Sequence, residues 1–145
     1  MVREYTDKFL SATRSAATAD AAAPQTVLHA AFDAILRGDY EEFGKWVTDD
    51  VHLSVRGMGA MDGAWHGRDA VVAAARKNFG MLAEQKPQIE GMIAAGDRIA
   101  VLLRESGVYK ASGETYSKRG VQWFSFSGGK IRSIEEFVAD DPGAA

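Results

Sequence analysis

The chain has 145 residues, of which 46% are hydrophobic and 26% are charged, and its formal net charge at pH 7 is −3. This length and composition are those expected of one globular domain. There is no cysteine, which excludes disulfides, thiolate metal sites and cysteine nucleophiles. The slightly negative charge gives no electrostatic reason to expect nucleic acid or an anionic membrane as a partner. No apolar run approaches the roughly 20 residues that span a bilayer.

Residues 1–23 differ from the rest of the chain. They contain no continuous apolar core of the kind that an export signal needs, so we expect a cytoplasmic protein. We expect them to form an arm, either mobile or ordered as a helix against a partner subunit. The domain itself is predicted over residues 24–140, with a short tail at 141–145.

Three helices are predicted in the first half of the domain. In residues 24–38 the apolar residues recur at helical spacing, and Gly38 ends the helix. Asp39, followed three residues later by Glu42, is typical of a helix N-cap, so a second, short helix is predicted there. A third helix is expected from Arg68, with these apolar residues on its buried side: Val71, Val72, Ala75, Phe79 and Leu82.

The strands are predicted around and after the third helix. One strand follows Asp49 and Asp50, and a short one lies beside Trp65, beyond a glycine-rich loop over residues 57–63. Four more are expected at 89–95, 98–109, 115–126 and 131–138. The short glycine-containing turns between these four favour antiparallel hairpins. Early helices and late strands indicate an α+β domain with the helices on one face of a curved antiparallel sheet.

Five local strings occur in this order with a spacing that resembles the NTF2-like superfamily, within it the SnoaL-like polyketide cyclases and ketosteroid-isomerase-like proteins. They are Leu28–Asp39, Trp46–Val51, Trp65–Arg68, Gly96–Val101 and Gly129–Phe137. The resemblance covers roughly residues 25–140. It implies a cone of three helices packed on a strongly curved antiparallel sheet, with a pocket between the first and third helices and the concave face.

The resemblance also implies catalytic candidates. Glu136 stands where SnoaL-like cyclases hold the acidic general acid/base, and burial of a carboxyl raises its pKa toward neutrality. Gln122, on the neighbouring strand, could donate a hydrogen bond to an enolate oxygen, and Glu105 could pair with either residue. Each candidate has an alternative. Glu136 could be a surface glutamate or a partner of Arg132 or Arg104. Gln122 could be a buried amide, and Glu105 could belong to a solvated charge pattern.

An apolar lining suited to a hydrophobic ligand is predicted around these candidates. The same side chains, taken singly, could simply fill a core. They are Phe32, Leu53, Met58, Met61, Trp65, Phe79, Leu103, Tyr109 and Phe124.

Other polar residues are weaker candidates. Asp62 could be an alternative base or an ordinary turn former. His66 resembles a structural residue of isomerase-like relatives, and His52 is expected at the surface or at a subunit contact. The three histidines of the chain have unrelated spacings, so no metal site is expected.

The isomerase residues themselves are absent from the matching positions, which hold Val55, Ala31 and Gln122. A steroid isomerase of the known mechanism is therefore not expected. The sequence instead predicts a pocket for a small apolar carbonyl compound, with cofactor-free and metal-free isomerase or cyclase chemistry. The alternatives are a non-catalytic binding module and an accessory dimeric subunit. Val121, Trp123 and Phe137 form an opposed apolar face, which argues for a homodimer through the sheet.

Overall fold

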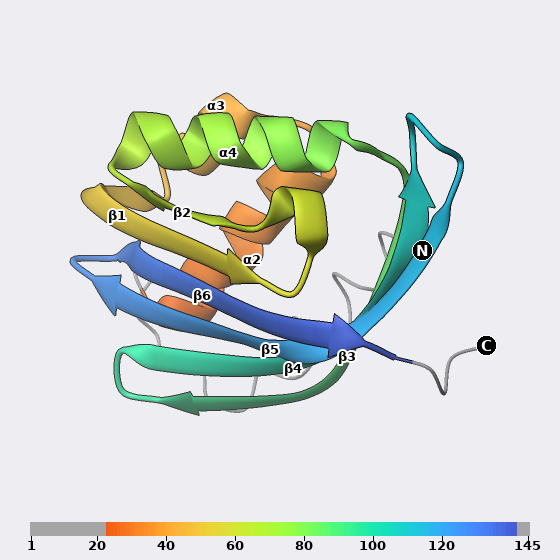
Figure 1. Cartoon of the computed structure of the whole chain (residues 1–145). Coiled ribbons are helices and arrows are strands. Elements are labelled where there is room, and N and C mark those ends of the chain that lie inside the picture. Colours follow the sequence, from red (N-terminus) through yellow and green to blue (C-terminus); the bar gives the residue numbers. More distant parts are fainter. Residues whose placement is uncertain (1–22, 142–145) are drawn as a thin grey trace.

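A computed structural model describes residues 23–141 of the chain (Figure 1). The predictions for the N-terminal arm and the C-terminal tail fall almost wholly outside these residues. Within them, none of the helices is long and apolar enough to cross a membrane.

The three predicted helices are present. They are α2 (Pro24–Leu36), α3 (Tyr40–Gly44) and α4 (Arg68–Gly80). The Asp39 carboxylate accepts the backbone N–H of Glu42 at 3.0 Å, which confirms the predicted N-cap of α3. Helix α4 ends earlier than predicted, because the carbonyl of Met81 accepts the N–H of Lys110 and the chain passes directly into a strand at Leu82.

Six strands and a 3₁₀ helix complete the described part of the domain. They are β1 (Val47–Arg56), the 3₁₀ helix η1 (Gly59–Met61), β2 (Gly63–His66), β3 (Leu82–Ala95), β4 (Arg98–Tyr109), β5 (Thr115–Ser127) and β6 (Lys130–Asp140). The six strands form one sheet in the order β2-β1-β6-β5-β4-β3.

The sheet is mixed and not wholly antiparallel, which corrects the prediction. Strands β1 and β6 pair in parallel, with Val55 opposite Glu136. Tight turns force consecutive strands to be antiparallel, but β1 and β6 are far apart in the sequence and escape that constraint. Strand β3 also begins at Leu82 and not at residue 89. Its first part carries Pro87, which an edge strand tolerates because the missing N–H faces away from the ladder.

The sheet is curved and holds the helices on its concave side. Figure 1 shows the ends of β3, β4 and β5 around the β4–β5 turn rising toward the C-terminal end of α4. The core lies between the layers, where the Phe32 ring of α2 meets the Phe124 ring of β5 edge to face at 5.7 Å between centroids. A second apolar cluster contains Val55, Met58, Met61 and Tyr116. The curvature leaves space between the two clusters.

Candidate functional site

A cavity of about 100 Å³ lies between α2, α4 and the concave face of the sheet. Helix α2 contributes one apolar wall through Phe32 and Ile35, and α4 contributes Ala75 and Phe79. Most of the predicted lining residues are in its wall: Phe32, Leu53, Met58, Met61, Phe79, Leu103 and Phe124. The wall is therefore largely apolar, with a few polar side chains set into it.

Two predicted lining residues, Trp65 and Tyr109, are not part of the wall. The Trp65 ring folds back over Gly63 on the same strand, where a Cβ would lie 2.7 Å from the ring. Tyr109 packs against Tyr116 with 5.1 Å between ring centroids, near the β4–β5 turn. Trp65 packs against both apolar clusters and Tyr109 against the second one, so both side chains belong to the core around the cavity.

The leading catalytic candidate, Glu136, faces this cavity. It lies directly opposite Gln122 in the β5–β6 ladder, and Gln122 Nε2 donates a hydrogen bond to Glu136 Oε1 at 2.9 Å. Burial raises the pKa of the Glu136 carboxyl, the Gln122 hydrogen bond opposes the rise, and the charge of Asp62 adds to it. Arg104, considered from the sequence as a partner of Glu136, instead pairs with Glu90 and Asp141.

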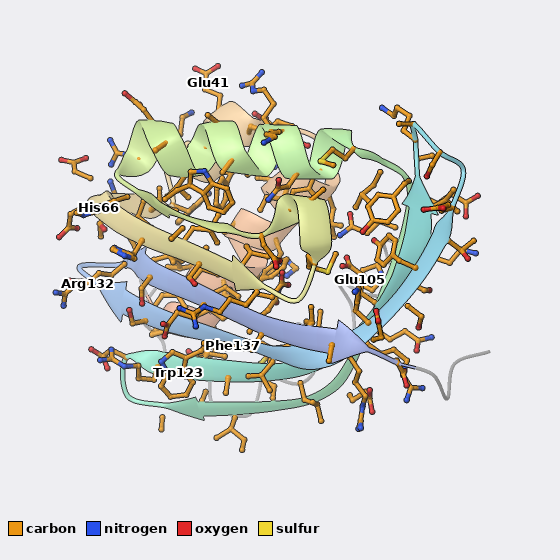
Figure 2. The ribbon with its side chains drawn as sticks, in the orientation of Figure 1. Glu41, His66, Glu105, Trp123, Arg132 and Phe137 are labelled. Atoms are coloured by element: carbon orange, nitrogen blue, oxygen red, sulfur yellow. The ribbon has the colours of Figure 1, made fainter. Side chains whose placement is uncertain are left out.

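Glu105 also lines the cavity, from β4. Gln85 on β3 donates its Nε2 hydrogen to Glu105 Oε1 at 2.6 Å. Burial, followed by the negative charge of Glu136, raises the pKa of Glu105 to about 7, and the hydrogen bond from Gln85 opposes this rise. Figure 2 shows Glu105 at the end of the sheet that curls toward α4. The site thus holds two carboxyl–carboxamide pairs, and the two carboxyls repel each other.

Asp62 behaves as a turn former. Its two carboxylate oxygens accept the backbone N–H groups of Gly57 at 3.2 Å and Met58 at 2.6 Å. These bonds tie together the loop that carries the methionines of the cavity wall. Asp62 is not itself part of that wall, although its charge acts on Glu136.

The histidines lie away from the cavity. His52 and His66 are opposite each other on β1 and β2, with ring centroids 4.9 Å apart, and both side chains are exposed. Within residues 23–141 there is no group of three or more histidine, aspartate or glutamate side chains that could hold a metal ion.

Two polar residues of the wall, Asn78 and Gln85, were not predicted from the sequence. Asn78 on α4 donates Nδ2 to the carbonyl of Met61 at 3.2 Å. It follows Val71 and Ala75 on the buried side of its helix. The sequence could have indicated this residue, because an amide occupies a position where the helical spacing predicts an apolar side chain. Gln85 gave no signal, because it lies in the part of β3 that the sequence pattern did not predict.

Three helices on the concave face of a curved sheet, enclosing an apolar cavity, define an NTF2-like domain. Residues 28–134 match the family model described as a SnoaL-like domain. The chain therefore belongs to the SnoaL-like domain family. No curated protein sequence matches it.

Several solved structures share this fold. An NTF2-like protein of unknown function from Burkholderia pseudomallei is 22% identical, with 83% of this chain and 92% of that chain covered and a TM-score of 0.69. A Mycobacterium tuberculosis protein in complex with estradiol-17β-hemisuccinate is 20% identical, with 77% and 89% covered and a TM-score of 0.66. A Catenulispora acidiphila protein with a ketosteroid isomerase-like fold, in complex with trimethylamine, is 15% identical, with 78% and 85% covered and a TM-score of 0.66. At these identities the likeness establishes the fold.

Proposed function

We propose that this protein binds a small apolar carbonyl compound in the cavity and catalyses a cofactor-free proton transfer, with Glu136 as the general base. One observation carries the proposal. A carboxyl held by the amide of Gln122 faces an apolar cavity, and Glu105 is the only other charged side chain among the described residues of its wall.

The two carboxyls have different roles in this scheme. Burial, followed by the negative charge of Glu136, raises the pKa of Glu105 to about 7. In this scheme Glu136 is the carboxyl that ionises, and its charge keeps the proton on Glu105. Ionised Glu136 removes a proton from the carbon next to the carbonyl. The electron pair of the C–H bond forms a carbon–carbon double bond, and the π pair of the carbonyl moves onto its oxygen. Protonated Glu105 donates a hydrogen bond to that oxygen. Glu136 then returns the proton to the same or a conjugated carbon, which regenerates both groups.

Gln122 positions the base in this proposal. Its Nε2 donor is engaged by Glu136, and this hydrogen bond fixes the carboxyl in the cavity. The role predicted from the sequence, donation to an enolate oxygen, stays a prediction that would use the second hydrogen of the same nitrogen. Gln85 is placed to do the same for Glu105.

The size of the cavity supports a small substrate. An engineered apolar cavity of about 150 Å³ binds benzene, and the cavity here is about 100 Å³. The Mycobacterium tuberculosis and Catenulispora acidiphila structures show that proteins of this fold hold small molecules. They support a small-molecule ligand for this chain as well.

The test is hydrogen–deuterium exchange at the methylene of 2-butanone in D₂O, followed by NMR. The wild-type protein should accelerate the exchange, and Glu136→Gln should lower the rate by about 10²–10⁴, as for loss of a general base. Glu135→Gln, at the neighbouring exposed position, is the matched control and should keep the wild-type rate. Equal, accelerated rates for wild type and Glu136→Gln would remove Glu136 from the mechanism. A wild-type rate no faster than that of buffer alone would favour a non-catalytic binding module.

A further inference from the structure

His52 and His66 form a pair of imidazoles at the edge of the sheet, outside the cavity. They lie opposite each other on β1 and β2, and both side chains are exposed. Figure 2 shows His66 at the end of the molecule away from Glu105. Beside this pair the N–H of Gly67 donates to the carbonyl of Val51 at 2.8 Å. Pair types alternate along an antiparallel ladder, so His52 and His66 form a non-hydrogen-bonded pair, the type that brings side chains closest together.

The spacing of the two rings fits the binding of one metal ion by both. Zn²⁺ binds an imidazole nitrogen at about 2.0–2.1 Å, so the ion lies about 3.2 Å from the centroid of a ring that binds it. Two rings that meet at one ion at about 90–110°, between square-planar and tetrahedral geometry, have centroids about 4.5–5.2 Å apart. The centroids of His52 and His66 are 4.9 Å apart, with 45° between the ring planes. Rotation of the rings can therefore direct two nitrogens at one ion without a change in the backbone.

The donor atoms select the kind of ion. Imidazole nitrogen suits Cu²⁺, Ni²⁺ and Zn²⁺, whereas Mg²⁺ and Ca²⁺ prefer oxygen ligands. Among residues 23–141 no third histidine, aspartate or glutamate joins the pair as a possible ligand. The two nitrogens thus leave the other coordination positions to water. Such a site imposes little geometry of its own, so its affinities should follow the general order for divalent ions, in which Cu²⁺ binds tightest.

The charges beside the rings are balanced. Asp50 lies two residues before His52, on the same side of β1. Its carboxylate accepts the hydroxyl of Thr48 at 2.8 Å. This hydrogen bond lowers the pKa of Asp50, and the positive charges of Arg132 and His66 add to the effect. Asp50 is therefore ionised at pH 7 and Arg132 opposes its charge, so binding of a cation at this edge depends on the two imidazoles.

We propose that His52 and His66 form a binding site for one divalent transition-metal ion, with Cu²⁺ bound more tightly than Ni²⁺ or Zn²⁺. The spacing of the histidines along the chain does not reveal this site, because the β1–β2 ladder is what brings them together. A bound ion joins β2, an edge strand of four residues, to β1. It should therefore stabilise this edge of the fold. The site lies outside the cavity and is independent of the proposed proton transfer.

The test is a calorimetric titration of the full chain, without a histidine tag, with Cu²⁺, Ni²⁺, Zn²⁺ and Mg²⁺. The wild type should bind one Cu²⁺ per chain and no Mg²⁺, and electron paramagnetic resonance of the Cu²⁺ complex should show two imidazole nitrogens. His52→Gln and His66→Gln should each lower the Cu²⁺ affinity at least about tenfold, since even changes around a metal ligand have an effect of this size. His29→Gln, the same change at the third histidine of the chain, is the matched control and should keep the wild-type affinity.

Thermal unfolding gives a second measurement. Zn²⁺ should raise the melting temperature of the wild type and of His29→Gln but not of His52→Gln, because only a folded pair of histidines binds the ion tightly. The side chains of His52 and His66 are exposed, so both variants should melt cooperatively without metal. Three results overturn the inference: no Cu²⁺ binding by the wild type, a Cu²⁺ complex with fewer than two imidazole nitrogens, or an affinity that His52→Gln and His66→Gln leave intact.

Discussion

Gln122 and Glu136 lie directly opposite each other on β5 and β6, and the Gln122 amide holds the Glu136 carboxyl by a hydrogen bond of 2.9 Å. Because this bond lowers the pKa of Glu136 against the effect of burial, we expect Gln122→Leu to raise it. The acidic limb of the pH profile for 2-butanone exchange should therefore move to higher pH. Gln88→Leu, at an exposed site, should leave the profile in place. If the acidic limb of the profile stays in place in Gln122→Leu, the Gln122 amide does not affect the pKa of Glu136.

Glu105 should make the fold less stable as the pH rises. Its pKa in the folded protein is about 7, against a usual value of 4.5, so its neutral form is favoured by folding. This contribution is complete below pH 4.5 and is lost by about pH 7, a loss of roughly 3 kcal/mol at most. Urea unfolding of Glu105→Gln should therefore show a smaller fall in the free energy of unfolding between pH 5 and pH 8 than the wild type. Glu135→Gln should follow the wild type, and identical pH curves for all three would refute the assignment.

Gly120 permits the close approach of β5 to β6 near the candidate site. A Cβ at this position would overlap the carbonyl oxygen of Phe137 and lie 2.6 Å from Val138 Cα. Gly120→Ala should thus cost about 1–3 kcal/mol in thermal or urea unfolding and displace Glu136 from Gln122. Gly91 on β3 has open space around it, so Gly91→Ala is the matched control and should be nearly neutral. If both variants lose the same stability, the close approach of β5 to β6 at Gly120 does not require a glycine.

The face of the sheet away from the helices should form a homodimer. Val121, Trp123 and Phe137 are 37%, 39% and 45% exposed, and Figure 2 shows Trp123 and Phe137 together on the outer face of β5 and β6. A continuous apolar surface of this kind gains by pairing with its own copy. Sedimentation should give a dimer for the wild type and a monomer for Trp123→Glu. Lys77→Glu on α4 is the control, and a wild-type monomer at high concentration would reject the dimer.

Much of the fold was predictable from the sequence. The helical spacing before Gly38, the cap at Asp39 and the glycine turns between the late strands are local signals, and each element they predicted is present. The hairpin geometry also placed Gln122 opposite Glu136. Local patterns could not show that β1 and β6 run parallel, since α4 and the strands β2 to β5 separate these two strands in the sequence.

The candidate site was predictable in part. Alternation along β4, β5 and β6 grouped Glu105, Gln122 and Glu136 on one face, but whether that face is the inner one depends on the curvature of the whole sheet. Trp65 was predicted in the lining, but its ring lies over Gly63 outside the cavity wall, a contact that strand alternation does not reveal. Gln85 was missed because the polar start of β3 has no apolar alternation to mark it as a strand.

The proposed proton transfer depends on the Glu136 carboxyl being shielded from water. The most direct test is a ¹³C NMR titration of glutamate side-chain carboxyls in the wild-type protein, with the Glu136 signal assigned by its loss in Glu136→Gln. We predict a pKa for Glu136 that is raised above the usual 4.5, because burial disfavours its charged form. A Glu136 resonance that titrates at or below the usual value would contradict the buried site and the chemistry proposed for it.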